Sequence, residues 1–362
     1  MISLHTTFQS KEFSCSIPDV KFAMSLTRAQ VKVSVSKNGD SDDIFNEYLY
    51  PDNKGIVELT DVDRLIEPFA NKWLVFGLSV RIEEQQLSDD GQERILSSDV
   101  RTLDCNVVSC RATILNTSAT EFCKSHFLTL LDGAKETAVG WTEFLTYIGT
   151  DTPRCSAKFD DGQTVSFNVP VVLQTEDYTL INCSPANFIS SGKSLVSYTI
   201  AAGNRRQSFH VNDDVEPDVA PVLLFYNSFG VQELAYCTGE HQQVSSFDRK
   251  QGRFGRLKRN YQIEEKETFK ADTGYLSFPM ANWWREVLRS SSVQLLRVYN
   301  GQVVTEFSTP IVITNEKSEI SNAPDFIPRF TFEYEYADRN HNVFDTRVEG
   351  RVFDNTFDNT FN

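Results

Sequence analysis

The sequence has 362 residues and carries 50 Asp and Glu against 35 Lys and Arg, which gives a net charge of −15 at pH 7. This acidic balance argues against a nucleic-acid binder or a protein of anionic membrane surfaces, because both kinds of binder present basic surfaces. The 27 Phe, 12 Tyr and 4 Trp exclude a disordered chain and suffice for two or three domain cores. No run of about 18 apolar residues occurs, so we expect no transmembrane helix.

Apolar and polar side chains alternate along residues 31–36, 165–169 and 330–336. A period of two predicts strands with one buried and one solvated face, as in antiparallel sheets. Dipeptides that favour tight hairpin turns occur at four places: Asn38-Gly39, Asp90-Gly91, Asp161-Gly162 and Asn300-Gly301. Short helical patterns occur at three: residues 61–69, 120–131 and 281–290. We therefore predict a mostly-β protein of tandem antiparallel β-sandwich domains with a few short helices.

The same patterns divide the chain into four parts. We predict a first β-sandwich domain over residues 1–112, a second β-rich domain over 113–215, a third β-sandwich domain over 216–314, and a C-terminal strand and aromatic tail over 315–362. An acidic, Pro-containing stretch at residues 211–217 marks the boundary between the second and third domains.

Sequence signatures of catalysis and of metal binding are missing. The seven Cys include no Cys-x-x-Cys pair, the five His form no His-Glu-x-x-His motif, and no Gly-x-Ser-x-Gly elbow occurs. We therefore predict no enzyme activity, no cofactor and no metal, and we expect the Cys to be reduced and mostly buried. Residues 1–10 lack a basic region followed by an apolar one, so we expect no secretory signal peptide.

One segment is strongly basic. Residues 249–259 contain six Lys or Arg, among them Arg253, Arg256 and Lys258. One interpretation is a flexible loop that contacts phosphate or docks into an acidic groove of a neighbouring copy. The other is a solvated excursion whose charge is balanced by the acidic residues just downstream. In so acidic a chain both subunit docking and the balanced excursion are favoured over nucleic-acid binding, and our hypothesis is an intersubunit contact.

The C-terminal tail repeats Phe-Asp-Asn-Thr and places Phe353, Phe357 and Phe361 four residues apart. This spacing suits one face of a helix, but Asp, Asn and Thr favour turns and caps over helices. Exposed Phe side chains promote aggregation, so we predict that the three rings occupy pockets on the same chain or on a partner. A disordered tail is the alternative.

Three segments carry a resemblance to a known group of proteins. The repeat at residues 353–362, the segment LFYNSFGVQE at 224–233 and the segment YPDNKGIVELTDV at 50–62 resemble parts of virion structural proteins from phages and prophages of gut Bacteroidetes. Those proteins are β-sandwich components of tail tips and baseplates. The resemblance implies a protein that is made in the host cytoplasm and packs into the virion with other tail proteins, and it implies no catalytic residues.

We predict a non-enzymatic phage virion structural protein, a tail or baseplate component that forms a homo-oligomer through its β-domains and aromatic tail. The alternative is a carbohydrate-binding or adhesin module that recognises a host surface glycan. Exposed rings stack on sugar faces in such modules, and Trp141, Trp283 and Trp284 are the candidates. A β-rich hydrolase of polysaccharide or peptidoglycan is a third interpretation.

Overall fold

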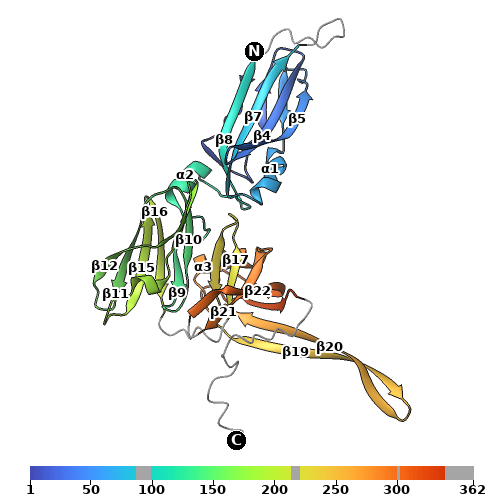
Figure 1. Cartoon of the computed structure of the whole chain (residues 1–362). Coiled ribbons are helices and arrows are strands. Elements are labelled where there is room, and N and C mark those ends of the chain that lie inside the picture. The colour runs from blue at the N-terminus through green and yellow to red at the C-terminus, as the bar shows by residue number, and fades with distance from the viewer. Residues whose placement is uncertain (87–98, 213–220, 300–301, 339–362) are drawn as a thin grey trace.

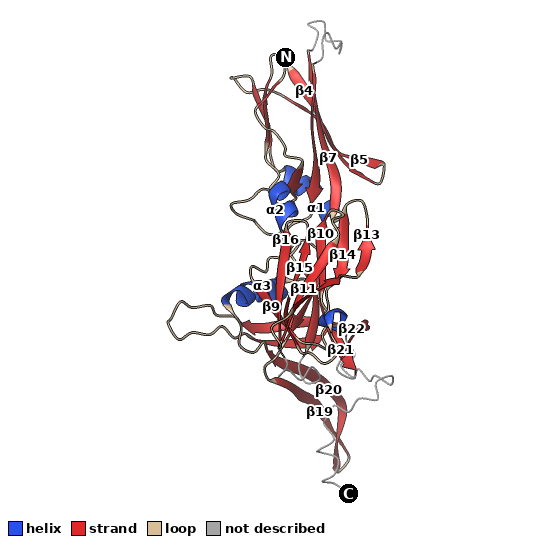
Figure 2. Ribbon diagram, turned by 90° about the vertical axis from the view of Figure 1, so that its left-hand side faces the viewer, coloured by secondary structure: helices blue, strands red, loops and turns tan. Residues whose placement is uncertain are grey.

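The computed structural model of the chain describes residues 1–86, 99–212, 221–299 and 302–338. Within these residues the strands form five sheets, accompanied by three short α-helices and one 3₁₀ turn. The prediction of a mostly-β chain with tandem antiparallel sandwiches and a few short helices is confirmed. Three units follow one another along an elongated molecule (Figures 1 and 2). None of the described helices is long and apolar enough to cross a membrane.

The first unit is a sandwich of two sheets. The larger sheet has the order β2 (Lys11–Phe13), β8 (Val100–Val108), β7 (Val75–Gln85), β4 (Arg28–Lys37) and β5 (Asp40–Leu49), and the smaller has the order β1 (Ser3–Leu4), β3 (Val20–Ala23) and β6 (Ile56–Leu59). Alternate residues of β4, such as Val31 and Val33, are fully buried between the sheets. Helix α1 (Val62–Ala70) adds Val62 and Ile66 to the same core. The edge strand β5 pairs with β4 alone.

The second unit is also a sandwich. Its larger sheet has the order β12 (Thr164–Asn168), β11 (Pro153–Phe159), β15 (Leu195–Ala202), β16 (Arg205–Val211) and β9 (Ala134–Thr137), and its smaller has the order β10 (Phe144–Ile148), β14 (Tyr178–Asn182) and β13 (Val171–Gln174). A 3₁₀ turn (Pro185–Phe188) and helix α2 (Ala119–Ser125) complete the unit. Tyr198 and Phe209 stack in its core with ring centroids 4.7 Å apart.

The third unit differs from the expected third sandwich, because one sheet and a helix form its two layers. The sheet has the order β18 (Gln232–Tyr236), β17 (Val222–Tyr226), β21 (Val293–Tyr299), β22 (Gln302–Lys317), β23 (Thr331–Tyr336), β20 (Leu257–Asp272) and β19 (His241–Phe254). Helix α3 (Phe278–Arg289) packs its buried Trp283 and Trp284 against this sheet. The expected boundary at residue 314 falls inside β22, and β23 lies between β22 and β20, so the described part of the C-terminal segment belongs to this sheet.

The predicted turns and helices are confirmed where the structure describes them. Asn38 and Gly39 adopt φ angles of 53° and 90° in the tight turn between β4 and β5. Asp161-Gly162 joins β11 and β12, whereas the other two turn dipeptides and the predicted boundary at residue 215 lie outside the described residues. The helices lie at the predicted places, although α2 ends at Ser125 because His126 adopts an extended backbone. The seven Cys are free thiols, and six of them are buried.

A shared apolar cluster joins the three units. Phe229 lies in the turn between β17 and β18 of the third unit and is fully buried. Its ring centroid is 5.4 Å from that of Phe122 in α2 and 6.1 Å from that of Phe13 in β2. Beside it, the backbone N–H of Arg111 donates to the carbonyl of Ser228 at 2.7 Å. The first, second and third units therefore pack on one another through side chains rather than through a bare linker.

Phe229→Ala tests this joint. Removing a fully buried ring leaves a cavity, so we expect the free energy of unfolding to fall by about 3–5 kcal/mol. Chemical unfolding followed by Trp fluorescence measures the change. Phe278→Ala is the matched control, because Phe278 is 46% exposed and its truncation removes little buried surface. Equal effects of the two substitutions would contradict the role of the joint.

Candidate functional site

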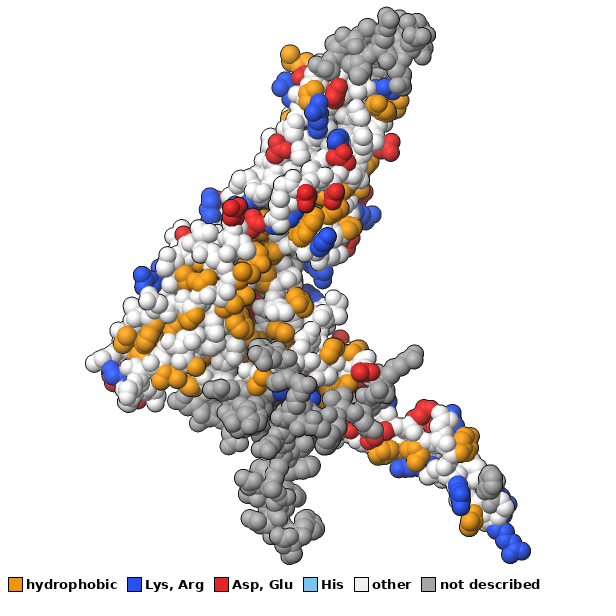
Figure 3. Space-filling model, viewed as in Figure 1, with side chains coloured by type: hydrophobic (Ala, Val, Ile, Leu, Met, Phe, Trp, Pro, Cys, Tyr) orange, Lys and Arg blue, Asp and Glu red, His pale blue; other side chains and the backbone are white. Residues whose placement is uncertain are grey.

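Strands β19 and β20 form a long antiparallel hairpin, which we call the arm. Only residues 269–272 of β20 pair with β23, so residues 244–268 extend beyond the body of the sheet. At about 3.3 Å per residue, this extension reaches about 35 Å. Figure 1 shows the arm projecting from the third unit, and Figure 3 shows it as a separate extension of the molecular surface.

The base of the arm is anchored in the core of the third unit. Phe269 of β20 stacks on Tyr334 of β23 with ring centroids 5.0 Å apart, and both rings are buried. Two ion pairs cross between the same strands, Lys266 to Glu335 at 2.8 Å and Lys270 to Glu333 at 2.9 Å. The arm is therefore a continuation of the core sheet.

The tip of the arm is a tight hairpin turn. Phe254 pairs with Leu257 across the loop Gly255-Arg256, and Gly255 has a φ of 60°. Glycine in the first position of a two-residue loop is typical of type II′ turns, whose twist matches that of the flanking strands. The part of our interpretation that made residues 249–259 a flexible loop is wrong, because ladder pairing and this turn order the segment as a hairpin.

All six cations of the predicted cluster gather at this tip. Arg253 lies directly opposite Lys258, and like charges in that position destabilise a strand pair. Among the described residues no carboxylate forms a salt bridge with any of the six, which are Arg249, Lys250, Arg253, Arg256, Lys258 and Arg259. The acidic residues Glu264, Glu265 and Glu267 therefore do not neutralise the tip by direct pairing.

The arm also exposes apolar side chains. Tyr261 is 70% exposed and Ile263 is 55% exposed. The Tyr261 ring lies over Gly252, where an added Cβ would stand 3.3 Å from its Cδ1 atom. On the same hairpin the Arg249 guanidinium lies 4.9 Å from the Phe247 ring centroid. Exposed rings together with unneutralised cations can bind an acidic protein surface that also offers apolar contact.

The other predicted site residues have different outcomes. Phe353, Phe357 and Phe361 lie outside the described residues. The three Trp considered for sugar stacking are buried, so that assignment is wrong for them: Trp141 is 4%, Trp283 1% and Trp284 0% exposed. The reason is that Trp141 stacks on Tyr236 with centroids 3.8 Å apart, while helix α3 turns the other two rings into the core of the third unit.

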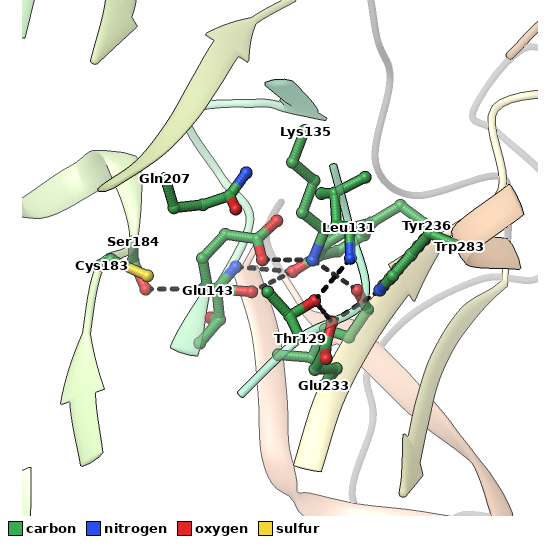
Figure 4. A network of polar contacts seen from close by, with 12 residues as sticks. Thr129, Leu131, Lys135, Glu143, Cys183, Ser184, Gln207, Glu233, Tyr236 and Trp283 are labelled. Atoms are coloured by element: carbon green, nitrogen blue, oxygen red, sulfur yellow. Dashed lines mark hydrogen bonds and ion pairs between the residues drawn. The ribbon is translucent and has the colours of Figure 1, made fainter. Parts of the chain in front are cut away.

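A buried ion pair that the sequence did not predict lies where the second unit meets the third (Figure 4). The Lys135 ammonium on β9 donates to Glu143 Oε2 at 2.6 Å and to the Leu234 carbonyl of β18 at 2.7 Å. Close by, Glu233 Oε2 accepts from Trp283 Nε1 at 2.8 Å. Burial raises the pKa of Glu143, and the neighbouring Lys135 charge opposes that rise. No motif marks these residues in the sequence, because the bonds from Lys135 to Leu234 and from Trp283 to Glu233 span 99 and 50 residues.

Lys135→Met removes the cation and leaves the Glu143 carboxyl buried without it. We expect the free energy of unfolding at pH 7 to fall by about 3–5 kcal/mol, since an uncompensated buried charge is strongly destabilising. Replacing both partners, in Lys135→Met with Glu143→Leu, should recover most of the loss. Chemical unfolding of the three proteins measures this, and a double variant no more stable than the single one would contradict the account.

A second buried carboxyl lies beside the joint of the three units. Glu286 of α3 accepts hydrogen bonds from the backbone N–H of Ser228, at 3.2 Å, and from the Ser228 hydroxyl, next to Phe229. Its Oε2 atom has no hydrogen-bond partner in the described part of the chain. Burial raises the pKa of Glu286 from 4.5 to about 7. The folded protein therefore holds a proton there that the unfolded chain has released by pH 6.

This proton makes stability depend on pH. Between pH 4.5 and 7 the folded state binds more protons than the unfolded state, so the free energy of unfolding falls as the pH rises, by up to about 3 kcal/mol from this group. The Glu286→Gln variant stays neutral, so its free energy of unfolding should not fall with pH through this group. We expect it to be more stable than the natural protein at pH 8 and about equally stable at pH 4.5. Melting temperatures across this range measure the difference, and parallel profiles for the two proteins would refute it.

Comparisons with known proteins leave the function open. No protein-family model matches the chain, and no curated protein is significantly similar to it. A solved structure of three immunoglobulin-like domains of titin, in an E-to-A mutated variant, aligns with 75% of this chain and 92% of its own length at 11% identity, with a TM-score of 0.18. A TM-score this low supports no conclusion about fold or function. No group of three or more His, Cys, Asp or Glu suited to a metal ion occurs among the described residues.

Proposed function

We propose that this chain is a non-enzymatic structural protein of a phage virion, a tail or baseplate component that assembles with copies of itself through the arm. The observation that carries the proposal is the arm: a hairpin of about 35 Å with unneutralised cations at its tip. A two-stranded hairpin with no layer packed on it is marginally stable in water. Contact with a partner would stabilise it by covering its exposed rings and neutralising its charges.

Charge favours a sibling copy or another acidic protein as that partner. The chain carries −15 overall, so each copy presents an excess of carboxylates to the basic tip of its neighbours. Complementary patches of this kind steer encounters and set the orientation of partners more than they add raw affinity. The proposed contact is therefore sensitive to ionic strength, since salt screens exposed charges over about 10 Å at 0.1 M.

The assignment to a virion rests on the resemblance of three sequence segments and on two further features that suit a structural part. The three units pack on one another through buried contacts, and one of the three similar segments, residues 224–233, contains the Phe229 turn at their joint. In this proposal the protein is made in the host cytoplasm and incorporated into the particle. The tail residues Phe353, Phe357 and Phe361 remain proposed as a second contact with neighbours or other tail proteins.

The proposal predicts that the arm mediates oligomerisation. Replacing Arg253, Arg256 and Lys258 with Ser removes three positive charges from the tip, so the dissociation constant of the oligomer should rise by about tenfold or more. Light scattering coupled to size exclusion measures the mass over a dilution series. Raising the salt concentration from 0.05 to 0.5 M should weaken the natural protein in the same direction.

A matched control separates this effect from the loss of charge as such. Substituting Lys21, Arg64 and Lys124 with Ser removes three exposed cations from the first and second units, and this variant should assemble like the natural protein. If the arm variant also assembles normally, the arm is not the contact. Genes for a tail tube or tape measure beside the gene for this chain would support the virion assignment independently.

A further inference from the structure

We infer that the surface receiving the arm is the free edge of β5 in the first unit of the next copy, so that copies associate head to tail. This inference rests on the proposed function, because it requires that the arm be an assembly contact. It adds the identity of the receiving surface, which consists of the outward edge of β5 and its carboxylates. The partner is a second copy of this chain.

Strand β5 is an open edge of suitable length. It has ten residues and pairs only with β4, so the N–H and C=O groups on its other side have no strand partner among the described residues. Such an edge accepts an additional strand from another chain through main-chain hydrogen bonds. The distal arm supplies strands for this role, because β19 pairs only with β20, and residues 257–268 of β20 pair only with β19.

The carboxylates of β5 select a basic partner. Asp40, Asp42 and Glu47 are exposed, and their cross-strand partners are alternate residues of β4, so all three share one face of the sheet. Within the described residues none of them forms a salt bridge. Lys37 lies directly opposite Asp40, but its ammonium is bound to Asp177 of the second unit. These charges prevent two β5 edges from pairing with each other and favour a cationic strand.

No other edge strand that the structure describes has this composition. Strand β5 carries four acidic side chains and no basic one, and Asp43, the fourth, is paired with Lys32 at 2.7 Å. Outside the arm, the other edge strands carry less charge: β1, β10, β12 and β13 carry none, β2 and β9 carry one Lys and one Glu each, and β6 and β18 carry a single Glu each. The tip of the arm carries six cations and no acid between residues 249 and 259. Charge complementarity therefore pairs the arm with β5 rather than with another described edge.

The placement of the two surfaces makes the contact intermolecular. The first unit and the arm lie at opposite ends of the elongated molecule in both ribbon views (Figures 1 and 2). One chain cannot close the contact on itself, but its arm can reach the first unit of a second chain. The interface is heterologous, because two different surfaces meet, and it leaves one arm and one edge free for further copies.

A charge-reversal experiment tests the pairing. One full-length variant carries a reversed arm (Arg253→Glu, Arg256→Glu, Lys258→Glu), and another carries a reversed edge (Asp40→Lys, Asp42→Lys, Glu47→Lys). Each alone places like charges across the contact, so the dissociation constant of its oligomer should rise by about 100-fold or more. Mixed together, the variants restore both possible contacts with opposite charges, so assembly should return to the level of the natural protein in light scattering.

The outcomes separate this inference from the proposed function. If the reversed arm assembles normally, the arm is not a contact and both ideas fail. If the reversed arm loses assembly while the reversed edge keeps it, or if mixing restores nothing, the arm docks elsewhere and β5 is excluded. Far-UV circular dichroism and melting temperature confirm that each variant is folded before its mass is interpreted.

Cross-linking of the unmodified protein gives a second measurement that needs no variant. A carbodiimide condenses a lysine amine with a carboxylate in direct contact, so we expect amide bonds between Lys250 or Lys258 and Asp40, Asp42 or Glu47. Mixing ¹⁴N- and ¹⁵N-labelled chains identifies intermolecular products by mass spectrometry. Arm lysines joined mainly to carboxylates other than those of β5 would overturn the inference.

Discussion

Burial of the turn between β17 and β18 fixes the positions of the three units relative to one another. This turn places Phe229 against Phe122 and Phe13, so one ring from the third unit completes a core to which the other two units also contribute. Tandem β-domains joined by linkers alone move relative to one another, because interfaces within a chain are usually small and polar. Here an apolar contact shared by all three units restricts that movement. The arm therefore keeps a defined direction relative to the first unit.

Buried and exposed charges have different roles in the molecule. Among the described residues, the buried Lys135 is paired with Glu143 at the boundary of the second and third units. At its surface the cations of the arm tip stand apart from the carboxylates of β5 by most of the length of the molecule. Charges that are buried and paired add specificity to a joint, whereas exposed charges of one sign favour contacts with other molecules.

The sequence predicted local structure well and long-range packing poorly. Alternation around Val33 and the Asn38-Gly39 turn identified strands and a hairpin, because these signals depend on neighbours in the chain. Lys135 and Trp283 gave no such signal, since the contacts of Lys135 with Leu234 and of Trp283 with Glu233 join residues far apart in the sequence. Composition located the basic segment but did not predict its hairpin form. That form depends on the turn at Gly255 and on strand pairing that continues the sheet of the third unit. The Trp considered as candidates for sugar stacking are buried: α3 turns Trp283 and Trp284 into the core, and Trp141 stacks on Tyr236.

In a head-to-tail assembly, the angle between β5 and the arm within each copy determines whether the copies form a ring or a helix. A heterologous contact closes into a ring if each copy adds a rotation that divides a full turn, and it otherwise continues as a helix. That angle depends on two attachments within each copy: the Phe229 cluster between the units and the Phe269 and Tyr334 stack at the base of the arm. If the units packed less tightly, the angle between β5 and the arm would vary from copy to copy. The oligomers would then have mixed sizes even with the arm contact intact. Packing between the units is therefore as much a condition of ordered assembly as the charges that meet at the interface.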